Sequence, residues 1–195
     1  MLRAVPRLRA DAPSSDAQLV EAARRGDAFS AEILVRRHVR AVNGLALRLL
    51  GRDGDVDDVV QDSFAAAFGA LDRLQDPQAF EAWICGILVR TVGKAIRRRR
   101  MLARLGLGRA LLAIDLDALI APSVPQDEAL ELRRLYALAE RLPAALRIPL
   151  LLQRVEGLGL VEIAKLTGAS LATVKRRITT AEVALRDSFL RGEGR

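Results

Sequence analysis

Apolar residues recur at steps of three and four positions along most of this chain, which is the spacing that gathers them on one face of a helix. The sequence contains no pair of alternating runs joined by a hairpin dipeptide. The clearest stripe begins near Asp55 and comprises Val56, Val59, Val60, Phe64, Ala67, Phe68 and Leu71. The pattern therefore predicts an all-α protein.

Four predicted helices form a first domain over residues 16–100. The first begins at Asp16, which suits an N-cap, and ends at Gly26, which suits a helix end. The second follows Asp27 and ends near Gly51. Its expected inner side comprises Phe29, Ile33, Val42, Leu45 and Leu49.

The fourth of these helices follows a predicted loop over residues 72–78, where Pro77 removes a backbone donor and disfavours helical geometry at Asp76. Its expected inner face comprises Phe80, Trp83, Ile84, Ile87, Leu88, Val92, Ala95 and Ile96. We favour a core position over a surface role for Trp83, because its helical spacing is typical of core residues. The helix ends in a cationic block over residues 97–100.

A second, smaller domain is predicted over residues 127–195, after a linker over 101–126 that is interrupted by glycine and proline. The linker is rich in leucine and isoleucine, so it either carries a short helix or lies against a partner. Residues 1–15 are expected to form a disordered arm. The fold class is thus two small all-α helical domains joined by a linker.

The second domain begins with a predicted helix that stops at Pro143 and presents Leu130, Leu135, Leu138 and Leu142 on one face. Another helix is predicted over residues 143–156. Pro149 falls inside it and should kink it or shift its start, because proline lacks a backbone donor and crowds the preceding turn.

Residues 160–185 have the pattern of a helix-turn-helix: two helices joined by a tight turn at Thr167-Gly168-Ala169, with Ser170 as the N-cap of the second helix. Ala164 allows the helices to cross closely, and Gly168 permits the turn conformation. The expected apolar seam comprises Ile163, Leu166, Leu171, Val174 and Ile178. The alternative interpretation is an ordinary helical hairpin with a solvated basic face.

The chain has a formal net charge of +7 and a sequence pI of about 10.8, which favours polyanionic partners, whether nucleic acid or a membrane surface. A single cysteine, Cys85, excludes an internal disulfide and a cysteine-based structural zinc site. Neither a signal peptide nor an apolar run of membrane-spanning length is evident in the sequence. We therefore expect a cytoplasmic protein with no direct membrane insertion.

Two stretches of the chain resemble parts of one known family. The sequence RVEGLGLVEIAKLTGASLATVKRRI, preceded by ERLPAALRIPLLL, is similar to region 4 of the extracytoplasmic-function (ECF) family of RNA polymerase sigma factors, which recognises the minus-35 promoter element. The sequence DVDDVVQDSFAAAFGAL, followed by AFEAWICGIL and a basic block, is similar to region 2, which binds the polymerase clamp and recognises the melted minus-10 element. The resemblance implies an alternative sigma factor that initiates transcription, found at the nucleoid when it is in holoenzyme. Its implied partners are core polymerase (the β′ and β subunits), promoter DNA and an anti-sigma factor that sequesters it.

The resemblance also implies roles for individual residues. Those expected to dock on a basic coiled coil of β′ are Asp57, Asp58, Gln61 and Asp62. Those expected to hold the minus-10 strand are Asp72, Arg73, Gln75, Gln78, Arg90, Lys94, Arg97, Arg98, Arg99 and Arg100. For the acidic residues, the alternative is that the helix dipole favours acids at a helix start, which would not explain Gln61. For the cationic residues, the alternative is a merely solvated basic face.

The residues expected to contact the minus-35 element are Ser170, Ala172, Thr173, Lys175, Arg176, Arg177 and Thr180. Three positions depart from the family pattern. Arg90 replaces a frequent Asn, and Thr180 and Glu182 replace two expected arginines. These changes bear on the minus-10 base preference and on phosphate affinity at minus-35.

No phosphate loop, metal-ligand cluster or facing carboxylate pair is apparent, so neither catalysis nor a cofactor nor a metal is expected. His38 is assigned to a helix surface, and Cys85 is assigned to packing in preference to redox sensing. Two rival functions remain at this point. One is a free-standing helix-turn-helix regulator, and the other is a sigma-like adaptor with weakened DNA binding.

Overall fold

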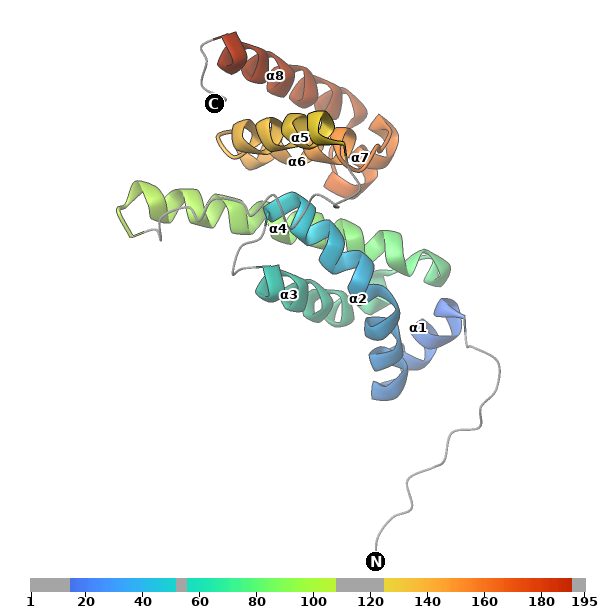
Figure 1. The fold of residues 1–195 in the computed structure, drawn as a ribbon. Helices are drawn as coiled ribbons and strands as arrows, with labels where there is room; N and C mark the ends of the chain where they lie inside the picture. Colours follow the sequence, from blue (N-terminus) through green and yellow to red (C-terminus); the bar gives the residue numbers. More distant parts are fainter. Residues whose placement is uncertain (1–14, 52–55, 108–124, 191–195) are drawn as a thin grey trace, which may run out of the picture.

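The computed structural model describes residues 15–51, 56–107 and 125–190. Within these ranges every regular element is an α-helix or a 3-10 helix, in two groups (Figure 1). This confirms the predicted all-α fold with two helical domains. The expected disordered arm lies outside the described residues except for Ser15, and most of the predicted linker also lies outside them.

The first group of helices surrounds a core of leucine, valine, isoleucine and phenylalanine side chains. Its elements are α1 (Asp16–Arg24), α2 (Ala28–Leu50), α3 (Val56–Gly69), η1 (Leu71–Arg73), η2 (Pro77–Ala79) and α4 (Phe80–Arg104). The segment between α3 and α4 was predicted to be an irregular loop, and that prediction was wrong in part. It contains the 3-10 turns η1 and η2, because Leu71 and Leu74 are buried and draw the chain against the core.

Helix starts in this domain depend on side-chain caps. The N-cap of α1 is Ser15 and not Asp16: Ser15 is extended, and its hydroxyl oxygen accepts a hydrogen bond from the Gln18 amide at 3.3 Å. Asp16 is already helical, which leaves its carboxylate available for α2. Asp27 caps α2 as its position predicted, by accepting from the amides of Phe29 and Ser30.

The buried face of α2 differs in phase from the predicted one. Val42, Leu45 and Leu49 are buried as expected, but Phe29 is 45% exposed. The buried stripe continues backward at steps of four through His38 and Leu34 to Ser30, which places Phe29 outside it. A phenylalanine in the first turn therefore faces solvent while a serine is buried.

The second group comprises α5 (Gln126–Ala139), α6 (Ala144–Arg154), α7 (Leu160–Thr167) and α8 (Leu171–Leu190). Helix α6 begins directly after Pro143 and runs through Pro149. Pro149 therefore neither ends the helix nor moves its start. Leu138 and Leu142 are buried as predicted, whereas Leu130 is exposed. No helix of the described residues is long and apolar enough to cross a membrane.

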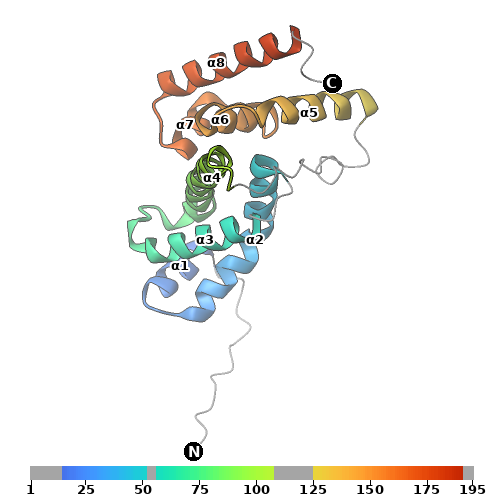
Figure 2. The same cartoon turned by 90° about the vertical axis from the view of Figure 1, so that its left-hand side faces the viewer.

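The two domains pack against each other and are not simply tethered. Figures 1 and 2 show α5 to α8 as a layer beside α4, and α4 contacts both α6 and α7. One continuous apolar cluster includes α2 and α4 side chains together with Tyr136, Ile148, Leu151 and Ile163 from the second domain. Docking of the second domain therefore buries apolar surface of both.

Candidate nucleic-acid interface

The helix-turn-helix forms as its sequence predicted. Gly168 ends α7 in the left-handed conformation at φ +65°, and the Ala169 amide donates to the Ala164 carbonyl at 3.2 Å. The Ser170 hydroxyl accepts from the Thr173 amide at 3.2 Å and so caps α8. Ile163, Val174 and Ile178 are buried between the helices, but Leu171 is 49% exposed, so its assignment to the seam was wrong. Leu171 is the first residue of α8.

The outer face of α8 carries the residues expected to contact DNA. Five of these residues are exposed: Ser170, Ala172, Lys175, Arg176 and Thr180. The other two, Thr173 and Arg177, are half-buried. The Thr180 hydroxyl donates to the Arg176 carbonyl at 2.9 Å, so part of its hydrogen-bonding capacity is used within the helix. Glu182, an acid in a position where a cation was expected, pairs with Arg154 of α6 at 2.7 Å. Its charge is therefore offset by a cation of the same domain.

The residues expected to dock on polymerase lie together on α3. Asp57, Asp58, Gln61 and Asp62 are all exposed, and the opposite side of the helix buries Val59, Val60, Ser63 and Phe64. The structure also places cations beside these acids. A depression on the surface is lined by Asp58, Gln61 and Asp62 of α3 and by Lys94 and Arg98 of α4.

The residues of the η1–η2 segment expected to hold a base are exposed: Asp72, Arg73, Gln75 and Gln78. Asp76 caps η2 by accepting from the Gln78 amide at 3.0 Å. Trp83 is half-buried, packs against the core and lies 6.2 Å from the Phe80 ring between centroids. The prediction of a core position for Trp83 is therefore correct in part, because the side chain packs on the core and also lines a groove.

This groove, with a volume of about 1000 Å³, lies between parts of the two domains. The first domain lines it with Arg73, Gln75, Gln78 and Trp83, among others. The second domain lines it with Glu156, Glu162 and Lys165, among others. In this arrangement the η1–η2 segment faces helix α7 across the groove.

The cationic residues of α4 divide into two groups. Arg90, Lys94, Arg97 and Arg98 are exposed. Arg99 and Arg100 are half-buried, and with Arg147 they line a pocket between α4 and the second domain. A guanidinium nitrogen of Arg100 donates to the Arg141 carbonyl. Only part of the basic block is therefore presented to solvent in this structure.

Polar contacts between the domains were not predicted, because their partners are distant in sequence. Arg48 of α2 forms an ion pair with Glu156 through both its Nε and Nη2, the latter at 2.9 Å from Oε2. The Tyr136 hydroxyl donates to the Arg48 carbonyl at 2.9 Å. The hydrogen bond with Glu156 raises the pKa of Arg48, and burial raises the pKa of Tyr136 to about 12. Both groups keep their ordinary charge at neutral pH.

Cys85 lines the same groove and is half-buried. Burial raises the pKa of its thiol to about 11, with a smaller contribution from nearby carboxylates. Because the thiolate is the reactive form, this favours the packing role over redox sensing. The described residues contain no group of three or more side chains that could hold a metal ion.

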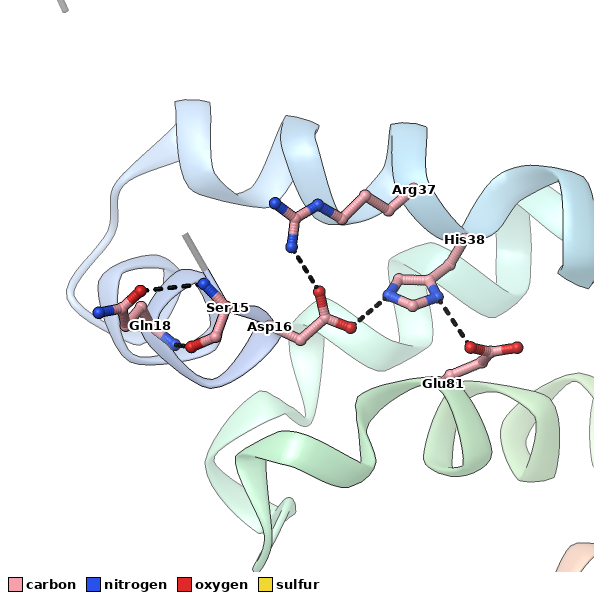
Figure 3. A network of polar contacts seen from close by, with 6 residues as sticks. All are labelled: Ser15, Asp16, Gln18, Arg37, His38 and Glu81. Carbon is pink, nitrogen blue, oxygen red and sulfur yellow. Dashed lines mark hydrogen bonds and ion pairs between the residues drawn. The ribbon is translucent and has the colours of Figure 1, made fainter. Parts of the chain in front are cut away.

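The assignment of His38 to a helix surface was wrong. His38 is 7% exposed, and Figure 3 shows its ring between two carboxylates of other helices. Its Nε2 lies 2.7 Å from Asp16 Oδ2, and its Nδ1 lies 3.7 Å from Glu81 Oε2. The steps of four that bury Leu34 and Val42 on the same face also bury position 38.

Asp16 also accepts a hydrogen bond from Arg37 at 2.9 Å (Figure 3). Burial by itself would raise the pKa of Asp16, but the hydrogen bonds and charges of Arg37 and His38 outweigh burial and lower it. The network joins α1, α2 and the start of α4.

Comparisons with known families agree with this geometry. The family model for Sigma-70 region 2 matches residues 34–101, and that for Sigma-70 region 4 matches residues 132–185. The first match ends within α4, and the second contains the helix-turn-helix.

Curated relatives cover most of the chain. The ECF RNA polymerase sigma-E factor of Escherichia coli K12 is 32% identical over 185 residues, which are 88% of this chain and 92% of that protein. RNA polymerase sigma factor NccH of Alcaligenes xylosoxydans xylosoxydans is 32% identical over 179 residues, which are 89% of this chain and 94% of that protein.

Two solved structures resemble the fold. The structure of CnrH in complex with the cytosolic domain of CnrY has a TM-score of 0.56 and 29% identity, covering 92% of this chain and 99% of that one. The sigma factor RpoE of Bartonella quintana, in complex with the anti-sigma factor NepR, has a TM-score of 0.57 and 22% identity. It covers 80% of this chain and 94% of that one, and supports the fold alone.

Proposed function

Since the chain belongs to the ECF family of RNA polymerase sigma factors, which are transcription initiation factors, we propose that three of its surfaces divide the work of promoter recognition. The acidic face of α3 docks on the β′ subunit of core polymerase. The η1–η2 segment and the exposed cations of α4 hold the melted minus-10 strand, and α8 contacts the minus-35 element. The protein acts as a specificity subunit and not as an enzyme.

The observation that carries this proposal is that one chain presents an exposed acidic surface on α3 and two other surfaces that carry exposed cations. A free-standing regulator would need α8 but not the acidic and amide groups of Asp57, Asp58 and Gln61. The ion pair of Glu182 with Arg154 offsets the acid that suggested an adaptor with weakened DNA binding. Both observations favour a DNA-binding subunit of polymerase.

The DNA-binding role is assigned residue by residue. We propose that Arg90, Lys94, Arg97 and Arg98 contact phosphates of the minus-10 strand, because they are exposed. Arg99 and Arg100 join them only when the second domain moves away, since they now line the pocket between the domains. On this proposal region 2 spans residues 16–100 and region 4 spans 127–195.

Promoter binding requires the domains to separate. The two promoter elements lie about 25 base pairs apart, or roughly 85 Å along the duplex at 3.4 Å per pair. In the structure the η1–η2 segment faces α7 across a single groove. Simultaneous contact with both elements therefore involves an open arrangement. We propose that an anti-sigma factor controls the protein by holding it away from polymerase. The solved structure of CnrH, which is 29% identical to this chain, is a complex with the cytosolic domain of CnrY, so a similar chain binds another protein.

The experiment is binding to core polymerase followed by transcription from a promoter library. The Asp57→Asn, Asp58→Asn double variant is expected to lose polymerase binding by about tenfold or more, because two docking charges are removed. The control is Asp127→Asn, Glu128→Gln, which removes the same charge from two exposed residues at the start of α5. Equal binding by both variants, or no start-site selection by the native chain, would contradict the proposal.

A further inference from the structure

Arg24, the last residue of α1, reaches across to the backbone of the η1–η2 segment. Its Nε and Nη2 donate to the Leu71 carbonyl at 3.3 and 3.1 Å. Nη2 also donates to the Leu74 carbonyl. These two carbonyls bracket η1, the turn that carries the exposed side chains of Asp72 and Arg73. One guanidinium group thus holds both ends of this turn.

A 3-10 turn of three residues cannot hold itself in place by its own hydrogen bonds. Its last carbonyls have no partners within the turn, and two backbone bonds close it: the Arg73 amide donates to the Ala70 carbonyl at 2.9 Å, and the Leu74 amide donates to the Leu71 carbonyl at 3.1 Å. Buried Leu71 and Leu74 attach the turn to the core. Arg24 supplies charged donors in a planar, rigid fork that approaches the backbone from α1.

The other contacts of Arg24 point to this task. Its side chain is 20% exposed and pairs with Glu21 at 2.5 Å within α1, which keeps the guanidinium aligned. Helix α1 also contacts η2, so the whole helix lies against the segment. None of the DNA-contact or polymerase-docking residues proposed above is on α1.

We propose that Arg24 is a positioning residue for minus-10 recognition, acting through the backbone of η1 and not by touching DNA. Discrimination between bases by hydrogen bonds needs donors and acceptors held to within a fraction of an ångström. Loss of Arg24 releases the turn, so Asp72 and Arg73 no longer present one fixed pattern to an unstacked base. The inference rests on the proposed function, because it assigns a determinant of base preference to the same segment.

The test compares Arg24→Ala and Arg24→Lys with Arg36→Ala. Lysine keeps the positive charge but has one nitrogen and cannot reproduce the fork. Arg36 is a matched control, because it also pairs with a glutamate of its own helix, Glu32 at 2.6 Å, but is 77% exposed and lies on α2 instead of α1.

The main measurement is transcription by reconstituted holoenzyme from templates randomised at minus-10 and, separately, at minus-35. Arg24→Ala is expected to flatten the base preference at minus-10 by about tenfold. The minus-35 preference should be unchanged, and Arg24→Lys should give an intermediate result. An unchanged minus-10 profile in both variants, or an equal loss at both elements, would overturn the proposal.

Hydrogen exchange of the free protein provides a readout that does not depend on transcription. Amides of residues 71–76 should exchange faster in Arg24→Ala than in the native chain, with no change in Arg36→Ala. If Arg24→Ala does not fold, Arg24→Lys decides both measurements. If native holoenzyme shows no preference at either element, the proposed function fails. The exchange result then still decides whether Arg24 holds η1.

Discussion

The two surfaces proposed to recognise DNA are held in place in different ways. The side chains of α8 project from a helix whose own backbone bonds fix their spacing, and its start is set locally by Gly168 and Ser170. The η1–η2 segment has only two short turns, and its position depends on Arg24, which is 47 residues away from Leu71 in the sequence. A recognition helix can be understood from its own sequence, whereas a recognition loop depends on distant parts of the chain.

This difference predicts where substitutions act. Changes within α8 should alter minus-35 contacts one at a time, because the helix keeps its geometry when a surface residue changes. Changes outside the η1–η2 segment can alter minus-10 contacts as a group, because they move the backbone that carries them.

The largest expected effect is at Phe80, the first residue of α4, which supports the η1–η2 segment from within the core. It is fully buried, with ring centroids of His38, Trp83 and Phe68 at 5.3, 6.2 and 6.3 Å. Phe80→Ala should lower the free energy of unfolding by about 3–5 kcal/mol, as measured by urea denaturation. Phe29→Ala makes the same change at a 45% exposed site and should cost much less. Equal losses would mean that the exposure of Phe29 is not as described.

A smaller effect is expected at Gly168, where the backbone is left-handed and nothing lies within 4 Å of an added Cβ. Gly168→Ala should cost about 1 kcal/mol, because the strain is conformational and not steric. The control is Gly69→Ala, which also meets open space but has no positive φ, and it should be neutral or slightly stabilising. Thermal unfolding of both variants measures the difference, and equal costs would remove the special role of the turn.

A still smaller effect is expected from the ion pair that joins the domains carrying the two surfaces. The side chains of Arg48 and Glu156 are 39% and 17% exposed, so solvent screens their interaction. A double-mutant cycle of Arg48→Gln and Glu156→Gln should give a coupling energy of about 0.5–1 kcal/mol. Urea denaturation measures it, and the coupling should fall as salt is added. Zero coupling at low salt would show that this ion pair does not help to hold the domains together.

The smallest effect is expected from the polar network in which Asp16 of α1 pairs with Arg37 and His38 of α2. Because the folded-state pKa of Asp16 is lowered, its carboxylate stabilises the fold above the ordinary range of aspartate, and this contribution is lost as pH falls through the folded-state pKa. Asp16→Asn should therefore be less stable than the native chain at about pH 7, and the difference should shrink below about pH 4.

Thermal denaturation across this pH range checks the prediction. Glu32→Gln is the control, because Glu32 is 53% exposed in its pair with Arg36, and its removal should change stability little at either end of the range. A difference between Asp16→Asn and the native chain that grew with acidity would reverse the sign and contradict the argument.

Much of the architecture was predictable from local pattern. The stripes of α3 and α4, the cap at Asp27 and the turn at Gly168 all follow from short-range preferences. Two of the errors share one cause, which is the phase of the buried stripe in the first half of α2. Phe29 faces solvent because it lies one residue off the stripe that buries Ser30 and His38. Leu171 is exposed as the first residue of α8.

The candidate site was predictable in its exposed residues but not in what holds them. The acids of α3 and the cations of α8 were identified because charge on the polar face of a helix is visible in sequence. The contacts of Arg24 and the half-burial of Arg100 were not, since nothing distinguishes these arginines from others in the chain.

The helices and the turn between α7 and α8 follow from the amino-acid sequence alone, because helical periodicity and the preferences of glycine, serine and proline act over a few residues. The family was indicated by the resemblance of two stretches of the chain to sigma-factor regions 2 and 4. The partners of individual polar side chains became visible only in the folded chain. Arg24, His38 and Arg48 find partners 47, 22 and 108 residues away. Such pairs form because packing brings their helices together, and a buried polar group must then find the partner that the fold places beside it.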